Sequence, residues 1–62
     1  VGQALDHLRT IDTRLAQVIR LRFYEERSQV EVGQRLGLSQ MHISRLERRA
    51  LAELRDWLAA RS

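Results

Sequence analysis

The sequence predicts a small all-α protein, a four-helix cluster that contains a helix-turn-helix and no strands. It has no proline and only three glycines, which leaves little room for long loops. Apolar residues make up 44% of the 62 residues and recur at helical spacing. The stretch 28–48 also carries the capping and turn residues of two successive helices. A chain of this length forms one domain with a limited core.

Two helices are expected ahead of that stretch. Ala4 to Leu8 is predicted to form a short helix, with Leu5 and Leu8 facing inward. Asp12 can cap a longer helix that runs to about Tyr24, since aspartate is a favoured N-cap residue. The inward stripe of this helix is expected to contain Leu15, Val18 and Ile19, with Phe23 as a candidate fourth member.

The helix-turn-helix is predicted from caps and glycines. Ser28 can cap a helix over about 29–36, with Glu31 three residues later to close a capping box. Gly33 falls where two helices must approach closely, and a side chain there would wedge them apart. Gly37 can take the left-handed conformation that ends the first helix. Ser39 can then cap a second helix over about 40–60.

The second helix separates into an apolar face and a polar face. At about 100° per residue, its inward residues fall within an arc of roughly 80°. The opposite side carries glutamine, serine, arginine and methionine. Glutamine can pair with adenine and arginine with guanine, so this side suits the reading of base edges. The alternative is a face that is simply solvated, as on any amphipathic helix. The inward set is Ile43, Leu46, Ala50, Leu54 and Trp57, and the outward set is Gln40, Met41, Ser44, Arg45 and Arg48.

The positive charge is concentrated in the second half of the chain. Residues 1–33 hold five arginines and five acids, whereas residues 34–62 hold six arginines and three acids. The formal net charge of +3 therefore lies with the predicted recognition helix, as a phosphate-facing surface requires. All eleven basic residues are arginine, a bias that either phosphate and guanine pairing or a GC-rich genome would produce.

Several function classes are disfavoured. The chain has no cysteine, which removes disulfides and zinc fingers and fits a reducing cytoplasm. His7 and His42 lie far apart in sequence, and no acid–base pair has a catalytic spacing, so neither an enzyme nor a metal or cofactor site is expected. No apolar run is long enough to span a membrane. Because the chain starts with Val1, we expect it to be excised from a longer protein.

A family resemblance rests on Leu21 to Phe23 (LRF) followed by SQVEVGQRLGLSQMHISRLERRALAELR. These residues resemble region 4 of bacterial sigma factors of the sigma-70 family, and the resemblance covers roughly 11–55. Ser39 to Leu46 is most similar to the alternative sigma factors of stress response and sporulation. Residues 1–62 would form one such domain, with a region 4.1-like part over 1–24 and a region 4.2-like part over 28–55. Where the family often has an LPERE-like entry, this chain lacks the proline and the second acid.

The resemblance implies recognition of the promoter −35 element by a chain bound to RNA polymerase in the bacterial cytoplasm. It places base reading on Gln40, Met41, Ser44 and Arg45. It also implies docking on the flap of the polymerase β subunit, with Leu15, Val18 and Ile19 as candidate contacts, and an anti-sigma protein as a further partner. In isolation the chain is expected to be a monomer. The expected phosphate contacts are Arg22, Ser28, Gln29, Arg48, Arg49 and Arg55.

Two other functions remain open from the sequence. A LuxR-type response-regulator helix-turn-helix is also a four-helix DNA reader, but that class dimerises through its last helix. A helical bundle that binds only proteins is the second alternative. The asymmetry of charge argues against it, and DNA binding that is absent or insensitive to salt would favour it.

Overall fold

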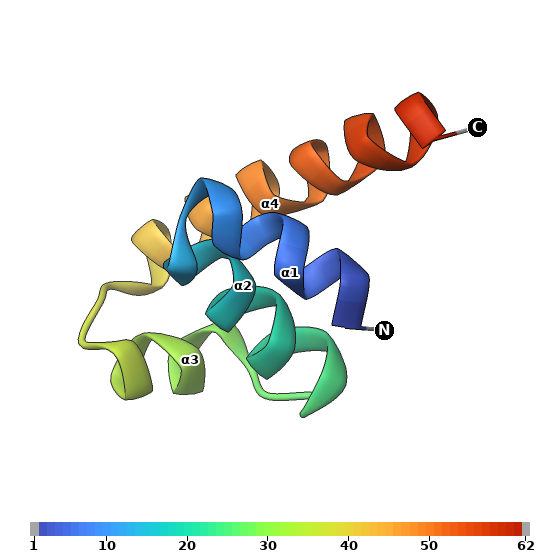
Figure 1. The fold of residues 1–62 in the computed structure, drawn as a ribbon. Coiled ribbons are helices and arrows are strands. Elements are labelled where there is room, and N and C mark those ends of the chain that lie inside the picture. The colour runs from blue at the N-terminus through green and yellow to red at the C-terminus, as the bar shows by residue number, and fades with distance from the viewer. Residues whose placement is uncertain (1, 62) are drawn as a thin grey trace.

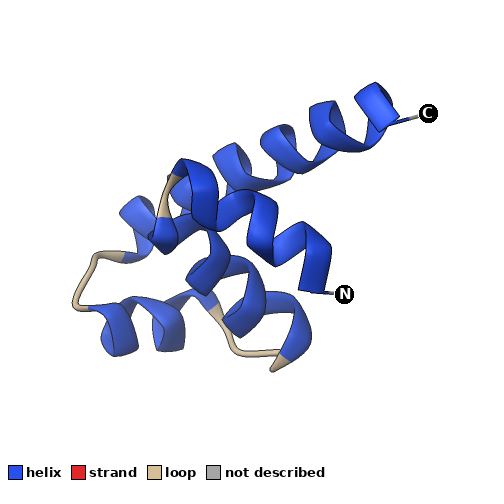
Figure 2. Ribbon diagram, in the orientation of Figure 1, coloured by secondary structure: helices blue, strands red, loops and turns tan. Residues whose placement is uncertain are grey.

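The structure is a computed structural model that describes residues 2–61. The predicted all-α fold is confirmed, and no strand occurs among these residues (Figure 2). None of the helices in this range is long and apolar enough to cross a membrane. In chain order the elements are α1 (Gly2–Ile11), α2 (Thr13–Ile19), the π-helix η1 (Arg20–Tyr24), α3 (Gln29–Leu36) and α4 (Gln40–Arg61).

Short polar side chains begin three of the helices, as the sequence predicts. The Asp12 carboxylate accepts a hydrogen bond from the Arg14 backbone N–H at 2.9 Å, at the start of α2. Ser28 and Glu31 form the complete capping box of α3. The Ser39 hydroxyl accepts from the backbone N–H of His42 at 3.1 Å, at the start of α4. Each contact satisfies an N–H group that the first helical turn leaves without an intrahelical acceptor.

The first helix is longer than the sequence predicts. Leu5 and Leu8 are buried as expected, but α1 spans Gly2–Ile11 rather than 4–8. Its flanking residues are mostly polar and give no inward stripe, so apolar periodicity could locate only the middle of the helix.

The end of the second predicted helix departs from α geometry. α2 runs directly into η1, which closes with wide hydrogen bonds from Glu25 N–H to the Arg20 carbonyl and from Arg27 N–H to the Leu21 carbonyl. Glu26 then takes a positive φ of 56° and turns the chain toward α3. The suggestion that Phe23 faces inward is wrong, since it is 48% exposed.

One hydrophobic core joins the helices. α2 lies at its centre, in contact with α1, α4 and η1, and α3 packs on α4 (Figure 1). The predicted inward residues of α4 are confirmed for Ile43, Leu46 and Ala50. The buried residues are Leu5, Leu8, Leu15, Ala16, Val18, Ile19, Leu21, Val32, Ile43, Leu46 and Ala50.

The long last helix gives the molecule its shape. α4 has 22 residues, and its C-terminal turns extend past α2 and α3 with α1 beside them (Figure 1). Leu54 packs against the core and Trp57 is half-buried, stacked on His7 with ring centroids 5.0 Å apart. Leu58, the residue after Trp57, is 57% exposed.

Candidate nucleic-acid interface

The turn between α3 and α4 holds the two helices close together. The carbonyl of Gly33 accepts hydrogen bonds from the backbone N–H groups of Gly37 and Leu38. A Cβ atom on Gly33 would lie 2.6 Å from the Leu38 carbonyl oxygen and 3.6 Å from Cγ1 of Ile43. Gly37 has φ +71°, the left-handed conformation that the sequence predicts. The close approach at Gly33 is therefore confirmed, with the turn itself as the nearest obstacle.

The four predicted base-reading residues all lie on the first turns of α4. Gln40, Met41 and Arg45 are exposed, with Met41 at 67%, and Ser44 is half-buried. One guanidinium nitrogen of Arg45 lies 3.7 Å from the Met41 sulfur. This pairing follows the i, i+4 spacing of a helix, so the sequence contained the signal for it. The structure brings the four residues together, and their contacts with bases stay a prediction.

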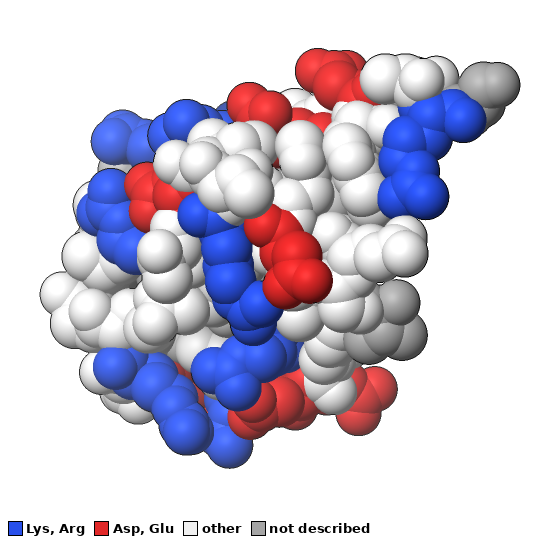
Figure 3. Space-filling model, viewed as in Figure 1, with Lys and Arg blue, Asp and Glu red and all other residues white. Residues whose placement is uncertain are grey.

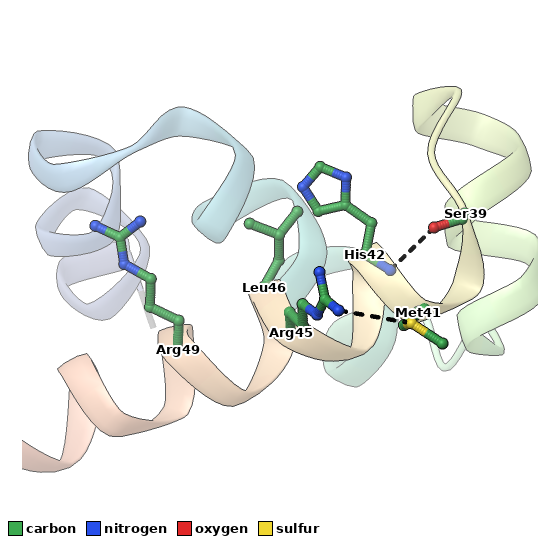
Figure 4. Close-up of a pocket in the computed structure, with 6 residues that line it drawn as sticks. All are labelled: Ser39, Met41, His42, Arg45, Leu46 and Arg49. Carbon is green, nitrogen blue, oxygen red and sulfur yellow. Dashed lines mark hydrogen bonds between the residues drawn. The ribbon is translucent and has the colours of Figure 1, made fainter.

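A shallow hollow lies along one side of this region (Figure 4). Its volume is about 370 Å³, and the side chains of Arg45 and Arg49 project from α4 on the same side as His42 (Figure 4). Arg45 is a predicted base contact and Arg49 a predicted phosphate contact. Both line the same hollow. Its lining consists of Ser39, Met41, His42, Arg45, Leu46 and Arg49.

The N-termini of α3 and α4 meet through a pair of glutamines. Gln40 donates a side-chain hydrogen bond from Nε2 to Oε1 of Gln29 at 3.4 Å. Gln29 is the first residue of α3 and follows Ser28, so two predicted phosphate contacts stand at a helix N-terminus, where N–H groups and the positive dipole end favour anions. This contact could not be predicted from sequence spacing, because it depends on how the turn between α3 and α4 places the two helices.

The predicted phosphate contacts on α4 differ in their surroundings. Arg48 and Arg49 are exposed and make no ion pair with any other residue in the range 2–61. The Arg55 side chain is 80% exposed and lies 3.7 Å from the Asp56 carboxylate. Arg55 lies about 22 Å along the helix from Gln40, given a rise of 1.5 Å per residue. Arg48 and Arg49 therefore flank the predicted reading residues, whereas Arg55 is remote from them.

Arg22 has a structural role that the sequence did not predict. Its Nε donates to Oε1 of Glu47 at 2.6 Å, and a second guanidinium nitrogen donates to the Arg27 carbonyl at 2.9 Å. The side chains of Arg22 and Glu47 are only 27% and 16% exposed. This ion pair joins η1 to α4 across 25 positions of sequence. The guanidinium of Arg22 is therefore already paired with a carboxylate, unlike those of Arg48 and Arg49.

The arginines divide into neutralised and free groups. Ion pairs hold six of them: Arg9, Arg14, Arg20, Arg22, Arg27 and Arg55. On the face shown in Figure 3, basic and acidic side chains are accordingly interleaved. Arg61 lies over the Trp57 ring, 4.7 Å from its centroid. Within residues 2–61, the arginines without an ion pair or aromatic partner are Arg35, Arg45, Arg48 and Arg49, at the end of α3 and on the first half of α4.

The candidate polymerase contacts on α2 need correction. Leu15 and Val18 are 0% exposed and Ile19 is 4% exposed. All three belong to the central core, because α2 is covered by α1 and α4. They cannot offer a docking surface in this structure.

The acidic groups of the described residues do not form a metal site. No cluster of three or more histidines, aspartates or glutamates that could hold a metal ion occurs in the range 2–61.

The pKa of Asp12 is lowered from its usual value, first by the backbone hydrogen bond from Arg14 and then by the side chain of Arg14, with a small contribution from the charge of Arg49. The carboxylate of Asp12 thus serves helix capping.

These features define a helix-turn-helix domain: a capped first helix, a glycine turn and a second helix with an exposed face flanked by arginines that have no ion pair. The model of the family "Sigma-70, region 4" matches residues 4–56. The chain belongs to that family.

Individual relatives agree with the family match. The chain is 45% identical over 51 residues to the RNA polymerase sigma-B factor of Bacillus subtilis strain 168. It is 43% identical over 51 residues to the RNA polymerase sigma factor SigF of Mycobacterium tuberculosis. Each alignment covers 82% of this chain and 20% of the relative, so the chain spans about a fifth of their length. The RNA polymerase sigma-G factor of Clostridium acetobutylicum is 31% identical over the same share of this chain. No solved structure matches the chain at a significant level.

Proposed function

We propose that this chain is the −35-binding domain of an alternative sigma factor of the stress-response and sporulation group. In this role α4 enters the major groove, and Gln40, Met41, Ser44 and Arg45 face the base edges. The relatives named sigma-B, SigF and sigma-G support the choice of group. The domain acts in the bacterial cytoplasm, where promoter DNA and RNA polymerase are found.

The distribution of unpaired arginines carries the proposal. Within the described residues, seven arginines are held by acids or by an aromatic ring, whereas Arg45, Arg48 and Arg49 on the first half of α4, and Arg35 at the end of α3, are not. A guanidinium without an acidic partner is available for phosphate or guanine. The same surface would gain little from binding a neutral protein, so DNA is the partner it fits best.

Polymerase and regulatory partners belong to the proposal through the family. A sigma factor brings this domain to the promoter while bound to core polymerase, and docking on the β flap is part of that role. Since Leu15, Val18 and Ile19 are buried, such docking would use exposed side chains of α1, α2 or η1 instead. An anti-sigma protein is the expected inhibitory partner.

The experiment compares base contacts with phosphate contacts in a binding selection on randomised −35 duplexes. Arg45→Ala should relax discrimination at one or two positions, with about 1–3 kcal/mol lost per specific contact. Arg49→Ala should weaken binding to all sequences alike and reduce the log–log salt slope by about one unit. Arg9→Ala is the matched control, because Arg9 lies on α1 and is already paired with Asp6 at 2.6 Å. An Arg45 variant with unchanged base preferences would refute the assignment of the reading face.

A further inference from the structure

The contact between Gln29 and Gln40 joins the two helices of the motif at equivalent places. Each glutamine is the first residue of its helix and follows a capping serine, Ser28 or Ser39. Gln40 is exposed and Gln29 is half-buried, so Gln29 is the more constrained of the two. Their hydrogen bond links a side chain of α3 directly to a side chain of α4. At 3.4 Å it is long for an N–H···O bond, so it orients the Gln40 amide without immobilising it.

From this contact we propose that Gln29 is a positioning residue for base recognition by Gln40. The inference rests on the proposed function, in which Gln40 reads a base. A glutamine amide has two N–H donors and one carbonyl acceptor. Adenine recognition uses one N–H toward N7 and the carbonyl oxygen toward the N6 amino group. Gln29 takes the second N–H, so the other N–H and the oxygen of Gln40 remain available as the pair that adenine requires.

Gln29 also has a donor group of its own to offer. Its carbonyl oxygen accepts from Gln40, which leaves the two N–H donors of its amide for another partner. These donors lie at the N-terminus of α3, where the helix dipole favours a phosphate. Gln29 therefore connects a backbone contact, which fixes the register on the duplex, to the side chain that reads the base.

Two substitutions of Gln29 separate these roles. Gln29→Lys removes the acceptor for Gln40 but keeps a donor for phosphate. Gln29→Glu keeps an acceptor for Gln40 but places a negative charge beside the phosphate. We expect Gln29→Lys to lose base preference while overall affinity is kept or raised. We expect Gln29→Glu to bind all sequences more weakly while the base preference is kept.

The measurement is a selection of the full chain on randomised −35 duplexes, with thermal melts to show that each variant folds. Gln40→Ala is the reference, and it should reduce the preference for one base at one position by about 5-fold to 150-fold. Gln29→Lys should flatten the preference at that same position, and the double variant Gln29→Lys with Gln40→Ala should flatten it no further than Gln40→Ala alone.

The outcomes distinguish this inference from the function beneath it. If Gln40→Ala changes the base preference but Gln29→Lys does not, the positioning role is overturned and the reading face stands. If Gln29→Lys and Gln29→Glu both weaken binding without touching the preference, Gln29 is a phosphate contact only and the inference is overturned. If Gln40→Ala leaves every preference unchanged, the inference and the reading role of Gln40 are overturned together.

Discussion

A methyl group at Gly33 would lie 2.6 Å from the carbonyl oxygen of Leu38, a distance that Cβ atoms do not tolerate. That oxygen belongs to the backbone of the turn, so it cannot move aside as a flexible side chain would. Overpacking typically costs about 1–3 kcal/mol, and the better helix propensity of alanine offsets up to about 1 kcal/mol of it. We expect Gly33→Ala to lower the free energy of unfolding by about 1–2 kcal/mol in a denaturant titration.

Gly2 provides the matched control for this substitution. It is the first residue of α1, and a Cβ atom there would meet nothing within 4 Å. Gly2→Ala should therefore leave the stability unchanged or slightly raised. Equal effects at the two glycines would contradict a steric role for Gly33.

The cap at Asp12 predicts a pH dependence of stability. Hydrogen bonds from Arg14 hold the pKa of Asp12 below its usual value. A carboxylate with a lowered folded-state pKa stabilises the fold above its unfolded pKa of about 3.9, and this contribution is lost as the pH falls through the lowered value. Asp12→Asn keeps an oxygen for the Arg14 N–H but carries no charge. We expect Asp12→Asn to be less stable than the wild-type chain at pH 7, and the difference to shrink in melts below about pH 4.

The single residues that could be predicted from the sequence act on near neighbours. The structure confirms the capping box of Ser28 and Glu31 and the left-handed conformation of Gly37. Both features were predicted from patterns that span three or four positions of sequence. Glu26 takes a positive φ of 56°, which could not be predicted from the sequence because glutamate rarely adopts this conformation. Helical spacing predicts Phe23 as a core residue only if the α-helix continues to Tyr24, but the chain forms a π-helix over Arg20–Tyr24 and Phe23 is exposed.

At the scale of elements, the ion pair between Arg22 and Glu47 holds η1 against α4. Both side chains are largely buried, and the bond length is 2.6 Å. Hydrogen bonds to charged groups contribute about 1.5–3 kcal/mol, more than exposed ion pairs do. Glu47→Gln removes the charge with little change of shape. We expect it to lower the free energy of unfolding by about 1–3 kcal/mol.

The exposed pair between Arg9 and Asp6 is the control for this prediction. It has the same 2.6 Å distance, but its side chains are 54% and 69% exposed. Asp6→Asn should therefore cost less than about 1 kcal/mol, because water competes for both groups. If Glu47→Gln lowers the free energy of unfolding less than Asp6→Asn does, burial does not strengthen the ion pair between Arg22 and Glu47.

The arrangement of elements follows from the sequence only where apolar spacing governs it. The inward faces of α2 and α4 were predicted, since Leu15, Val18, Ile43 and Leu46 repeat at helical intervals. Burial also explains why the first two of these residues failed as partner contacts: an apolar stripe marks a core face as readily as a docking face. The stacking of His7 on Trp57 and the Arg22–Glu47 pair join distant positions, and no local rule could identify them.

At the scale of the whole molecule, the proposed DNA-binding surface is small. The accessible surface totals 4219 Å², and a single helix-turn-helix module typically buries only about 600–1,000 Å² on DNA. A net charge of +3 gives modest counterion release. These quantities favour weak binding by one domain alone, whatever the quality of its reading face.

Tethering resolves this weakness under the sigma-factor proposal. When a sigma factor that contains this domain is bound to core polymerase, the −35 contact becomes effectively intramolecular, so a weak contact suffices. We expect micromolar or weaker affinity of the isolated chain for a −35 duplex at physiological salt, and much tighter promoter binding in the polymerase complex. Titration of labelled duplex with each species measures both values. Nanomolar binding of two chains to one palindromic duplex would falsify the sigma-factor proposal, because it would mean that affinity comes from dimerisation, as in the LuxR-type alternative.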